Sequence, residues 1–144
     1  MVANPPENTP RITPYLLYED VGAALDWLAR AFGFRERFRM PGPDGKITHA
    51  EMMLSEGLVM MGYPGPDYRN PKRLGQATTH IHVYVDDVDA HYEQARSAGA
   101  RILAEPEDQF YGDRRYGAED PEGHTWYFAQ HIRDVAPEDM KPPR

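Results

Sequence analysis

The chain of 144 residues contains no cysteine, no long apolar run and no excess of basic residues. The absence of cysteine excludes disulfides, zinc–thiolate sites and cysteine nucleophiles. No apolar run approaches the roughly 18–20 residues that span a bilayer, so we expect no membrane partner. The N-terminus lacks a basic region followed by an apolar stretch, which predicts that there is no signal peptide and that the protein is cytoplasmic.

Basic residues are scarce, because 16 Lys and Arg stand against 23 Asp and Glu and give a formal net charge of −7. Nucleic-acid binding needs clustered basic side chains that neutralise phosphates, so we expect no nucleic-acid partner. The acidic balance permits a cationic ligand, although an acidic surface usually serves solubility alone. The hydrophobic fraction of 40% and the charged fraction of 27% are typical of one globular domain.

An internal repeat is the strongest feature that is present. The segments Ile12–Val21 and Thr79–Val88 are both apolar-rich, and each ends in an Asp-Val pair that precedes an amphipathic stretch. The acidic residues of these pairs, Asp20 and Asp87, are 67 positions apart, close to half the chain. The repeat therefore predicts two similar modules of about 60 residues, each too small to bury a good core alone. We expect the modules to pair and to form a cleft between them.

The order of expected elements is the same in both halves. Asp20 and Asp87 are expected to cap helices that end at Gly33 and Gly99, and strands precede and follow each helix. Residues 105–109 are expected to form a polar connection between strands. We therefore predict an α+β fold of two tandem βαβββ modules that form a curved sheet around the cleft. The predicted segments are a flexible tail (1–10), the first module (11–63), a linker loop (64–78), the second module (79–131) and a C-terminal tail (132–144).

One face of each sheet should carry the functional side chains, because the helix covers the other. In the second module, apolar residues of the opening strand alternate with polar ones, which places His80, His82 and Tyr84 on the face without a helix. Tyr15 is the counterpart in the first module, and Tyr127 lies on the last strand. The three tyrosines could provide stacking surface in the cleft.

The repeat, together with the motif Asp120-Pro-Glu-Gly-His-Thr-Trp126 before the last strand, resembles the vicinal oxygen chelate superfamily. The resemblance covers residues 11–131 and is greatest to the glyoxalase/bleomycin resistance protein-like branch. It implies the tandem βαβββ fold. It also implies a homodimer whose cleft lies between the first module of one chain and the second module of its partner.

The resemblance further implies positions for metal ligands, and most of them are occupied by unsuitable residues here. The opening strands offer Thr13 and His80, the last strand offers Tyr127, and Leu58–Met61 offers no acidic residue. His80 is thus the one aligned residue of ligand type, so no metal or other cofactor is favoured. A divalent Zn, Ni, Fe or Mn remains possible through a rebuilt site. The residues available for such a site are His49, Glu51, His80, His82 and His131.

Several residues keep alternative interpretations. His49 and Glu51 share a strand face and could be a ligand pair, an acid/base pair or a structural pair, while His80 and His82 could bind a metal or line a polar pocket. Either Arg114 or Arg115 should point into the cleft and could pair with a ligand carboxylate. On its helix, His91 is expected to be solvated.

We consider two functions. The first is a protein that binds a small aromatic or cationic molecule in the cleft without metal, as the bleomycin-resistance relatives do. The alternative is a lyase, isomerase or dioxygenase that depends on a divalent metal, with Glu51 and His80 as catalytic candidates. The predicted ligand-binding residues are Tyr15, His49, Glu51, His80, His82, Tyr84, Arg114 and Tyr127.

Overall fold

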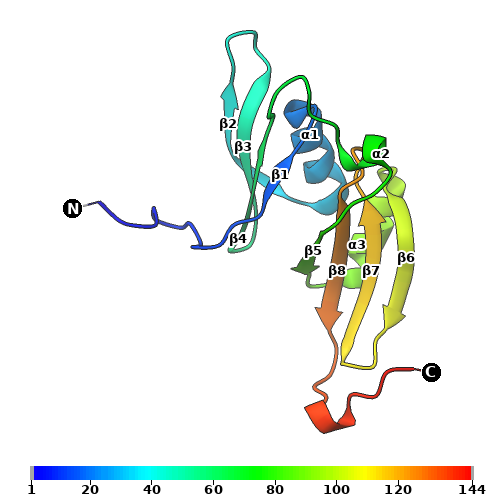
Figure 1. Ribbon diagram of the computed structural model, residues 1–144. Helices are drawn as coiled ribbons and strands as arrows, with labels where there is room; N and C mark the ends of the chain where they lie inside the picture. The colour runs from blue at the N-terminus through cyan, green and yellow to red at the C-terminus, as the bar shows by residue number, and fades with distance from the viewer. Residues whose placement is uncertain (1, 144) are drawn as a thin grey trace.

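The computed structural model describes residues 2–143 and shows two modules, each with a helix and four strands (Figure 1). The first module contains β1 (Tyr15–Leu17), α1 (Val21–Phe32), β2 (Arg35–Pro41), β3 (Ile47–Leu54) and β4 (Gly57–Gly62). The second contains β5 (His80–Tyr84), α3 (Val88–Ser97), β6 (Arg101–Asp108), β7 (Asp113–Glu119) and β8 (Thr125–His131). A short helix, α2 (Pro71–Leu74), joins the modules, and a 3-10 turn, η1 (Pro137–Asp139), follows them. The predicted tandem βαβββ fold is confirmed.

Both long helices begin as the sequence predicts. The side chain of Asp20 accepts a hydrogen bond from the backbone N–H of Ala23, and Asp87 does the same for Ala90. Helix α1 ends at Gly33, whose φ of 77° is the left-handed conformation that glycine adopts without a steric penalty. The caps therefore fix where each helix leaves its opening strand.

The strands form two separate sheets, in the orders β1-β4-β3-β2 and β5-β8-β7-β6. In each sheet the opening strand runs parallel to the last strand of its module, and the other neighbours are antiparallel. Within residues 2–143 no strand pair joins the two sheets and neither sheet closes into a barrel. The expected curved sheet thus consists of two halves.

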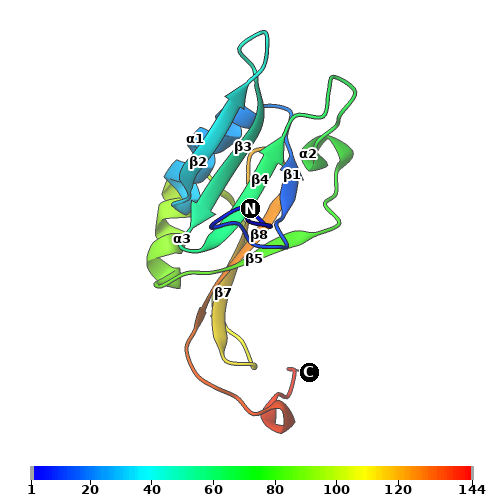
Figure 2. The ribbon, with the colours of Figure 1, turned by 90° about the vertical axis from the view of Figure 1, so that its left-hand side faces the viewer.

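A shared core lies between the modules, because each helix packs on its own sheet and α1 also packs against α3 (Figures 1 and 2). The ring of Phe32, at the end of α1, lies 4.6 Å from that of Phe128 and 5.6 Å from that of Trp126, both on β8. These rings are almost fully buried. The helices and the core therefore occupy one side of each sheet and leave the opposite side of each uncovered by a helix.

His91 corrects one expectation, because it is half-buried against this core and is not free in solvent. Its Nδ1 lies 2.6 Å from the hydroxyl of Tyr116 and its Nε2 lies 2.8 Å from the carbonyl oxygen of Phe32. Burial lowers the pKa of His91, which favours the neutral ring. The imidazole connects α3 to the end of α1 and so ties the two modules together.

The turn that begins at Asp120 makes the second connection between the modules. Asp120 is 5% exposed, and its Oδ2 accepts hydrogen bonds from the hydroxyl of Tyr18 at 2.6 Å and from Nε1 of Trp126 at 3.1 Å. Its Oδ1 accepts the backbone N–H groups of Glu122 and His124, each at 3.0 Å. One carboxylate thus joins the end of the first opening strand to the last strand of the second module.

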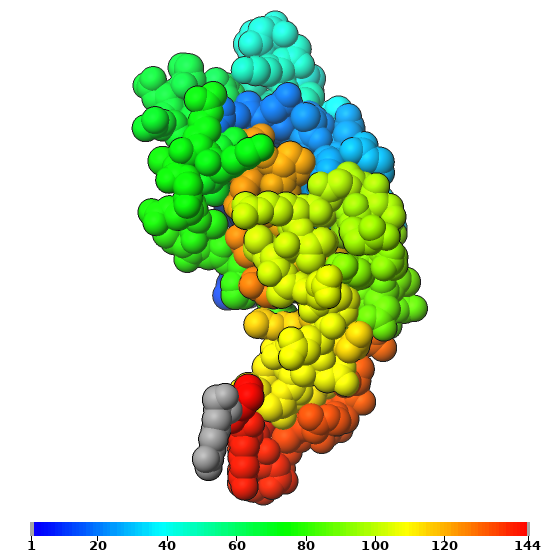
Figure 3. Space-filling model, turned by 90° about the vertical axis from the view of Figure 1, so that its right-hand side faces the viewer, coloured from blue at the N-terminus to red at the C-terminus, as the bar shows by residue number. Residues whose placement is uncertain are grey.

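The linker is anchored to the same turn. The carboxylate of Glu122 accepts hydrogen bonds from the backbone N–H groups of Glu19 and Asp20 and from the side chain of Asn70. The backbone N–H of Lys72 donates to the carbonyl of Glu122 at 2.9 Å, and Figure 3 shows the linker against this part of the second module. The linker loop expected over 64–78 therefore contains an anchored helical turn, α2.

Two further observations complete the fold. Strand β6 continues to Asp108 through two register shifts, so most of the polar connection expected over 105–109 is strand. The alternation of side chains along β6 cannot be recognised in the sequence, because the register shifts break its period of two. Among residues 2–143, no helix is long and apolar enough to cross a membrane.

We predict that Asp120→Ala will destabilise the protein by about 2–4 kcal/mol, because buried donors lose their acceptor. Urea-induced unfolding measures the change. Asp26→Ala, at an exposed acid on α1, is the matched control and is expected to change stability by less than about 0.5 kcal/mol. A loss below about 1 kcal/mol for Asp120→Ala would show that the turn does not hold the modules together.

Candidate functional site

Each sheet has one face that is turned away from its helix. We call the face of the first sheet opposite α1 the sheet-1 face and the face of the second sheet opposite α3 the sheet-2 face. Alternation along the strands assigns the side chains: Ala50 and Met52 are buried toward α1, and His49 and Glu51, which alternate with them, lie on the other side. The sheet-1 face carries Tyr15, Leu17, His49, Glu51 and Met60, and the sheet-2 face carries His80, His82, Tyr84, Arg115 and Tyr127.

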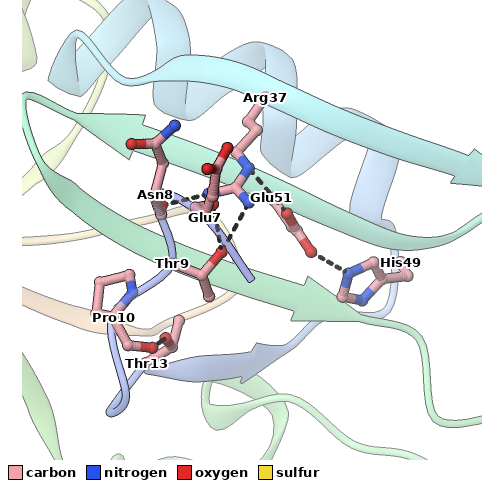
Figure 4. Close-up of polar contacts among 8 residues, drawn as sticks. All are labelled: Glu7, Asn8, Thr9, Pro10, Thr13, Arg37, His49 and Glu51. Carbon is pink, nitrogen blue, oxygen red and sulfur yellow. Dashed lines mark hydrogen bonds and ion pairs between the residues drawn. The ribbon is translucent and has the colours of Figure 1, made fainter. Parts of the chain in front are cut away.

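A row of polar contacts crosses the sheet-1 face. The hydroxyl of Tyr15 lies 2.8 Å from Nδ1 of His49, and Nε2 of His49 lies 3.0 Å from Oε2 of Glu51. The other oxygen of Glu51 lies 3.4 Å from Nε of Arg37 (Figure 4). Because a carboxylate only accepts hydrogen bonds, Nε2 of His49 is the donor to Glu51, and its Nδ1 is left within hydrogen-bond distance of the Tyr15 hydroxyl. The predicted residues Tyr15, His49 and Glu51 are therefore brought together, with the charge of Glu51 balanced by Arg37.

Arg37 also holds the N-terminal segment against this face. Its Nη1 donates to the carbonyl of Asn8 and its Nη2 donates to Oγ1 of Thr9, both at 2.9 Å (Figure 4). The segment lies across β4 in Figure 2, and it covers part of the sheet-1 face that would otherwise be open. Sequence reasoning missed Arg37 because a register shift between Glu36 and Phe38 changes which residues of β2 face the site.

Both faces place a tyrosine ring over a glycine of the neighbouring strand. A Cβ added at Gly62 would lie 3.1 Å from Cζ of Tyr15, and one added at Gly117 would lie 2.6 Å from Cε1 of Tyr127. Any larger residue would displace the ring, so the glycines are required for these ring positions. The repeat thus preserves a ring platform on each face.

Rings dominate the sheet-2 face. The ring centroids of His80 and Tyr127 are 4.7 Å apart, and those of His82 and Tyr84 are 5.0 Å apart in an edge-to-face arrangement. The guanidinium of Arg115 lies 4.6 Å from the centroid of Tyr127. The alternation predicted for His80, His82 and Tyr84 agrees with the structure.

The structure corrects the prediction that Arg114 is a ligand-binding residue. Arg114 lies on the α3 side of β7, where it forms ion pairs of 3.0 Å with Asp89 of α3 and with Asp108 of β6. Arg115 faces the opposite side and contacts Tyr127. The next residue, Tyr116, is buried and so faces the core. Because adjacent residues of a strand face opposite sides, the burial of Tyr116 places Arg115 on the helix-free face.

A buried carboxylate that sequence reasoning missed lies at the far end of the sheet-2 face. Asp113 is 4% exposed and accepts hydrogen bonds from the hydroxyl of Tyr84 at 2.8 Å and from Nδ1 of His131 at 2.7 Å. Burial acts to raise the pKa of Asp113, but the hydrogen bonds from His131 and Tyr84 outweigh it and lower the pKa. Nε2 of His131 lies 2.7 Å from Asp134, and hydrogen bonds to Asp134 and Asp113 raise the pKa of His131. The cluster attaches the C-terminal tail to the sheet.

The predicted site residues form two groups and do not converge within one chain. No hydrogen bond or ring contact among residues 2–143 joins the Tyr15–His49–Glu51 row to the rings of the sheet-2 face. A groove of about 540 Å³ does run between β4 and β5, but it receives only His82 and Tyr84 from the sheet-2 face and none of the row. The catalytic candidates Glu51 and His80 are therefore on different faces.

The residues of a single chain do not fit a divalent metal. Among residues 2–143, no three His, Asp or Glu side chains are placed so that they could hold an ion. His49 and Glu51 are adjacent but bind each other and Arg37, and His80 lies against Tyr127. Metal sites require three or four converging N or O donors, which this arrangement does not supply.

Comparison with known proteins agrees with the duplicated fold. The profile of the Glyoxalase/Bleomycin resistance protein/Dioxygenase superfamily matches residues 11–128, which span nearly all of both modules. An uncharacterised protein from Mycobacterium bovis is 37% identical over 131 residues, covering 88% of this chain and 86% of that protein.

Solved structures give the same result. TioX from Micromonospora sp. ML1 is 36% identical with a TM-score of 0.71, covering 86% of this chain and 100% of TioX. The genomically encoded fosfomycin resistance protein FosX from Listeria monocytogenes is 12% identical with a TM-score of 0.63, covering 92% of this chain and 98% of FosX. TioX is therefore similar in sequence and shape, whereas FosX shows the shared fold alone.

We predict that His131→Gln will lower the melting temperature more at about pH 5.5 than at about pH 8.5. The raised pKa of His131 means that its charge stabilises the fold fully below its usual pKa of about 6.5 and that this contribution is lost as pH rises through the raised value. Thermal unfolding at the two pH values measures the difference. Asp134→Asn removes one partner and should give a smaller pH-dependent effect. An equal loss of melting temperature at both pH values would contradict a stabilising charge on His131.

Proposed function

This chain belongs to the Glyoxalase/Bleomycin resistance protein/Dioxygenase superfamily, and on that basis we propose that it is a cytoplasmic, homodimeric protein that binds a small aromatic molecule without metal. The observation that carries the proposal is the set of exposed rings on both helix-free faces. Tyr15 is 49% exposed, Phe38 is 42% exposed and Tyr84 is 59% exposed. Aromatic side chains on a face that the chain leaves open favour a ligand or a partner that stacks on them.

Of the two ligand classes predicted from the sequence, an aromatic molecule is favoured over a cationic one. A carboxylate would strengthen the binding of a cation, but Glu51 is paired with Arg37 and Asp113 is occupied by Tyr84 and His131, which leaves the rings alone to attract one. Met60 lies beside Tyr15 on the sheet-1 face and adds an adaptable apolar surface. These contacts support a flat, largely apolar ligand.

The dimer follows from the separation of the two faces. Within one chain, the helices and the shared core lie behind both sheets, so neither face closes against the other. In a dimer, the sheet-1 face of one chain can close against the sheet-2 face of its partner. Such an arrangement would enclose the ligand between rings from both chains and bury apolar area on both faces.

The protein is predicted to sediment as a dimer, with twice the chain mass of 16.5 kDa. The physical reason is that a pocket formed by both faces requires two copies of the chain. Sedimentation velocity at several protein concentrations measures the state. A monomer at all concentrations would contradict the shared pocket and leave only the groove between β4 and β5.

Tyr15→Leu and Tyr127→Leu are each predicted to weaken binding of 2-naphthamide, a neutral aromatic probe, by roughly two- to tenfold, because a stacked ring pair is lost. Isothermal titration calorimetry measures the affinity. Leu74→Ala, at an exposed apolar residue on α2 away from both faces, is the control and should not change it. The chelator EDTA should leave the affinity unchanged. Loss of binding on chelation, with one equivalent of metal in the purified protein, would favour the metal-dependent alternative.

A further inference from the structure

Among residues 2–143, two arginines of the strands, Arg35 and Arg115, have no acidic partner, and Arg115 is the one whose guanidinium lies over an aromatic ring. Within residues 2–143, no Asp or Glu oxygen lies within 4.0 Å of its guanidinium nitrogens, whereas the adjacent Arg114 has two such partners. Arg37 and Arg101 are also paired with carboxylates. In a chain with a net charge of −7, an unpaired guanidinium on the helix-free face of a sheet calls for a functional explanation.

Both acidic residues of β7, the strand that carries Arg115, are engaged by other groups. Asp113, two residues before it on the same face, already accepts hydrogen bonds from Tyr84 and His131. Glu119, at the other end of β7, pairs with Arg101 at 2.8 Å. Glu107 is the register partner of Arg115 on β6 and is exposed, yet it forms no ion pair with it. Along β7, no free carboxylate therefore competes with a ligand for Arg115, and across the strand pair the exposed Glu107 does not bind it.

The histidines nearby contribute rings to the surroundings of Arg115. Burial lowers the pKa of His82; the charge of Asp113 opposes this change, and the charge of Arg115 adds to it. His80 also lies against Tyr127, so the phenol ring contacts both an imidazole and the guanidinium. The face thus offers one fixed positive charge among aromatic rings.

The position of Arg115 over Tyr127 suits recognition of a planar acid. A guanidinium held against a ring face keeps its N–H groups in its own plane, where they can form two parallel hydrogen bonds with a carboxylate. The ring of Tyr127 is held in place over Gly117, so the guanidinium rests on a fixed support. A ligand ring can then lie against the rings of this face while its acid group reaches Arg115.

We infer that the sheet-2 face binds an aromatic carboxylate, with Arg115 as the anion-binding residue and Tyr127 as the residue that positions it. This inference rests on the proposed aromatic-binding function and specifies the chemical class of its ligand. It makes the preferred ligand anionic, which is opposite to the cation that the net charge permits.

Three probes of matched size test the inference on the full-length protein: 2-naphthoate, 2-naphthamide and protonated 2-naphthylmethylamine. Calorimetry at about pH 7.5, where unperturbed histidine is mostly neutral, isolates the charge of Arg115. We expect naphthoate to bind about ten- to a hundredfold more tightly than naphthamide, the range given by charge-assisted hydrogen bonds, and the cation to bind least. Arg115→Gln should remove the preference for naphthoate and leave the affinity for naphthamide within about twofold.

Arg114→Gln is the matched control, because it removes the same charge from the opposite side of the same strand. It should leave the naphthoate preference intact. Arg115→Lys keeps the positive charge but loses the planar pair of donors, so it should retain a reduced preference and separate a binding defect from a folding defect.

The outcomes distinguish the inference from the function on which it rests. Equal binding of the three probes, unchanged in Arg115→Gln, would overturn the role of Arg115 while leaving an aromatic-binding protein. If Arg114→Gln lost the naphthoate preference as well as Arg115→Gln, the preference would arise from the overall electrostatic field of the protein, and the inference would also be overturned. Binding of none of the probes would overturn the proposed aromatic-binding function and the inference together.

Discussion

The buried carboxylate of Asp120 is the interaction on which the arrangement of this molecule depends. A carboxylate can be buried only if its oxygens are satisfied, and here four donors do so from both modules. Burial raises the pKa of Asp120, and the hydrogen bond from Tyr18 opposes that change. Because the donors are fixed in direction, the carboxylate specifies how the first opening strand meets the last strand.

The hydrogen bonds of Asp120, together with those of His91, determine which surfaces of the molecule are free to bind a ligand. The two connections hold α1 against α3, so the apolar side of both sheets is used for the shared core. Each module alone has too little apolar area for a stable core, and pairing through the helices solves this problem. The consequence is that both ring-bearing faces are left for other contacts.

Much of this arrangement could be predicted from the sequence. Alternation with a period of two placed His80, His82 and Tyr84 on one face, and the repeat predicted the modules and their caps. The bulge in β2 could not be predicted, because a single inserted residue leaves no periodic signal, and Arg37 was missed for that reason. His91 was misjudged since its burial depends on how α3 meets α1, which is a contact between modules.

Arg115 shows why net charge is a weak guide to the ligand. The formal charge of −7 describes the whole surface, and charges separated by more than a Debye length of about 8 Å are largely screened at physiological ionic strength. A ligand in contact with Tyr127 responds mainly to the groups beside it, where the nearest buried carboxylate, Asp113, is already paired with His131. The sign of the preferred ligand is therefore set by which carboxylates are occupied, and that information exists only in the folded chain.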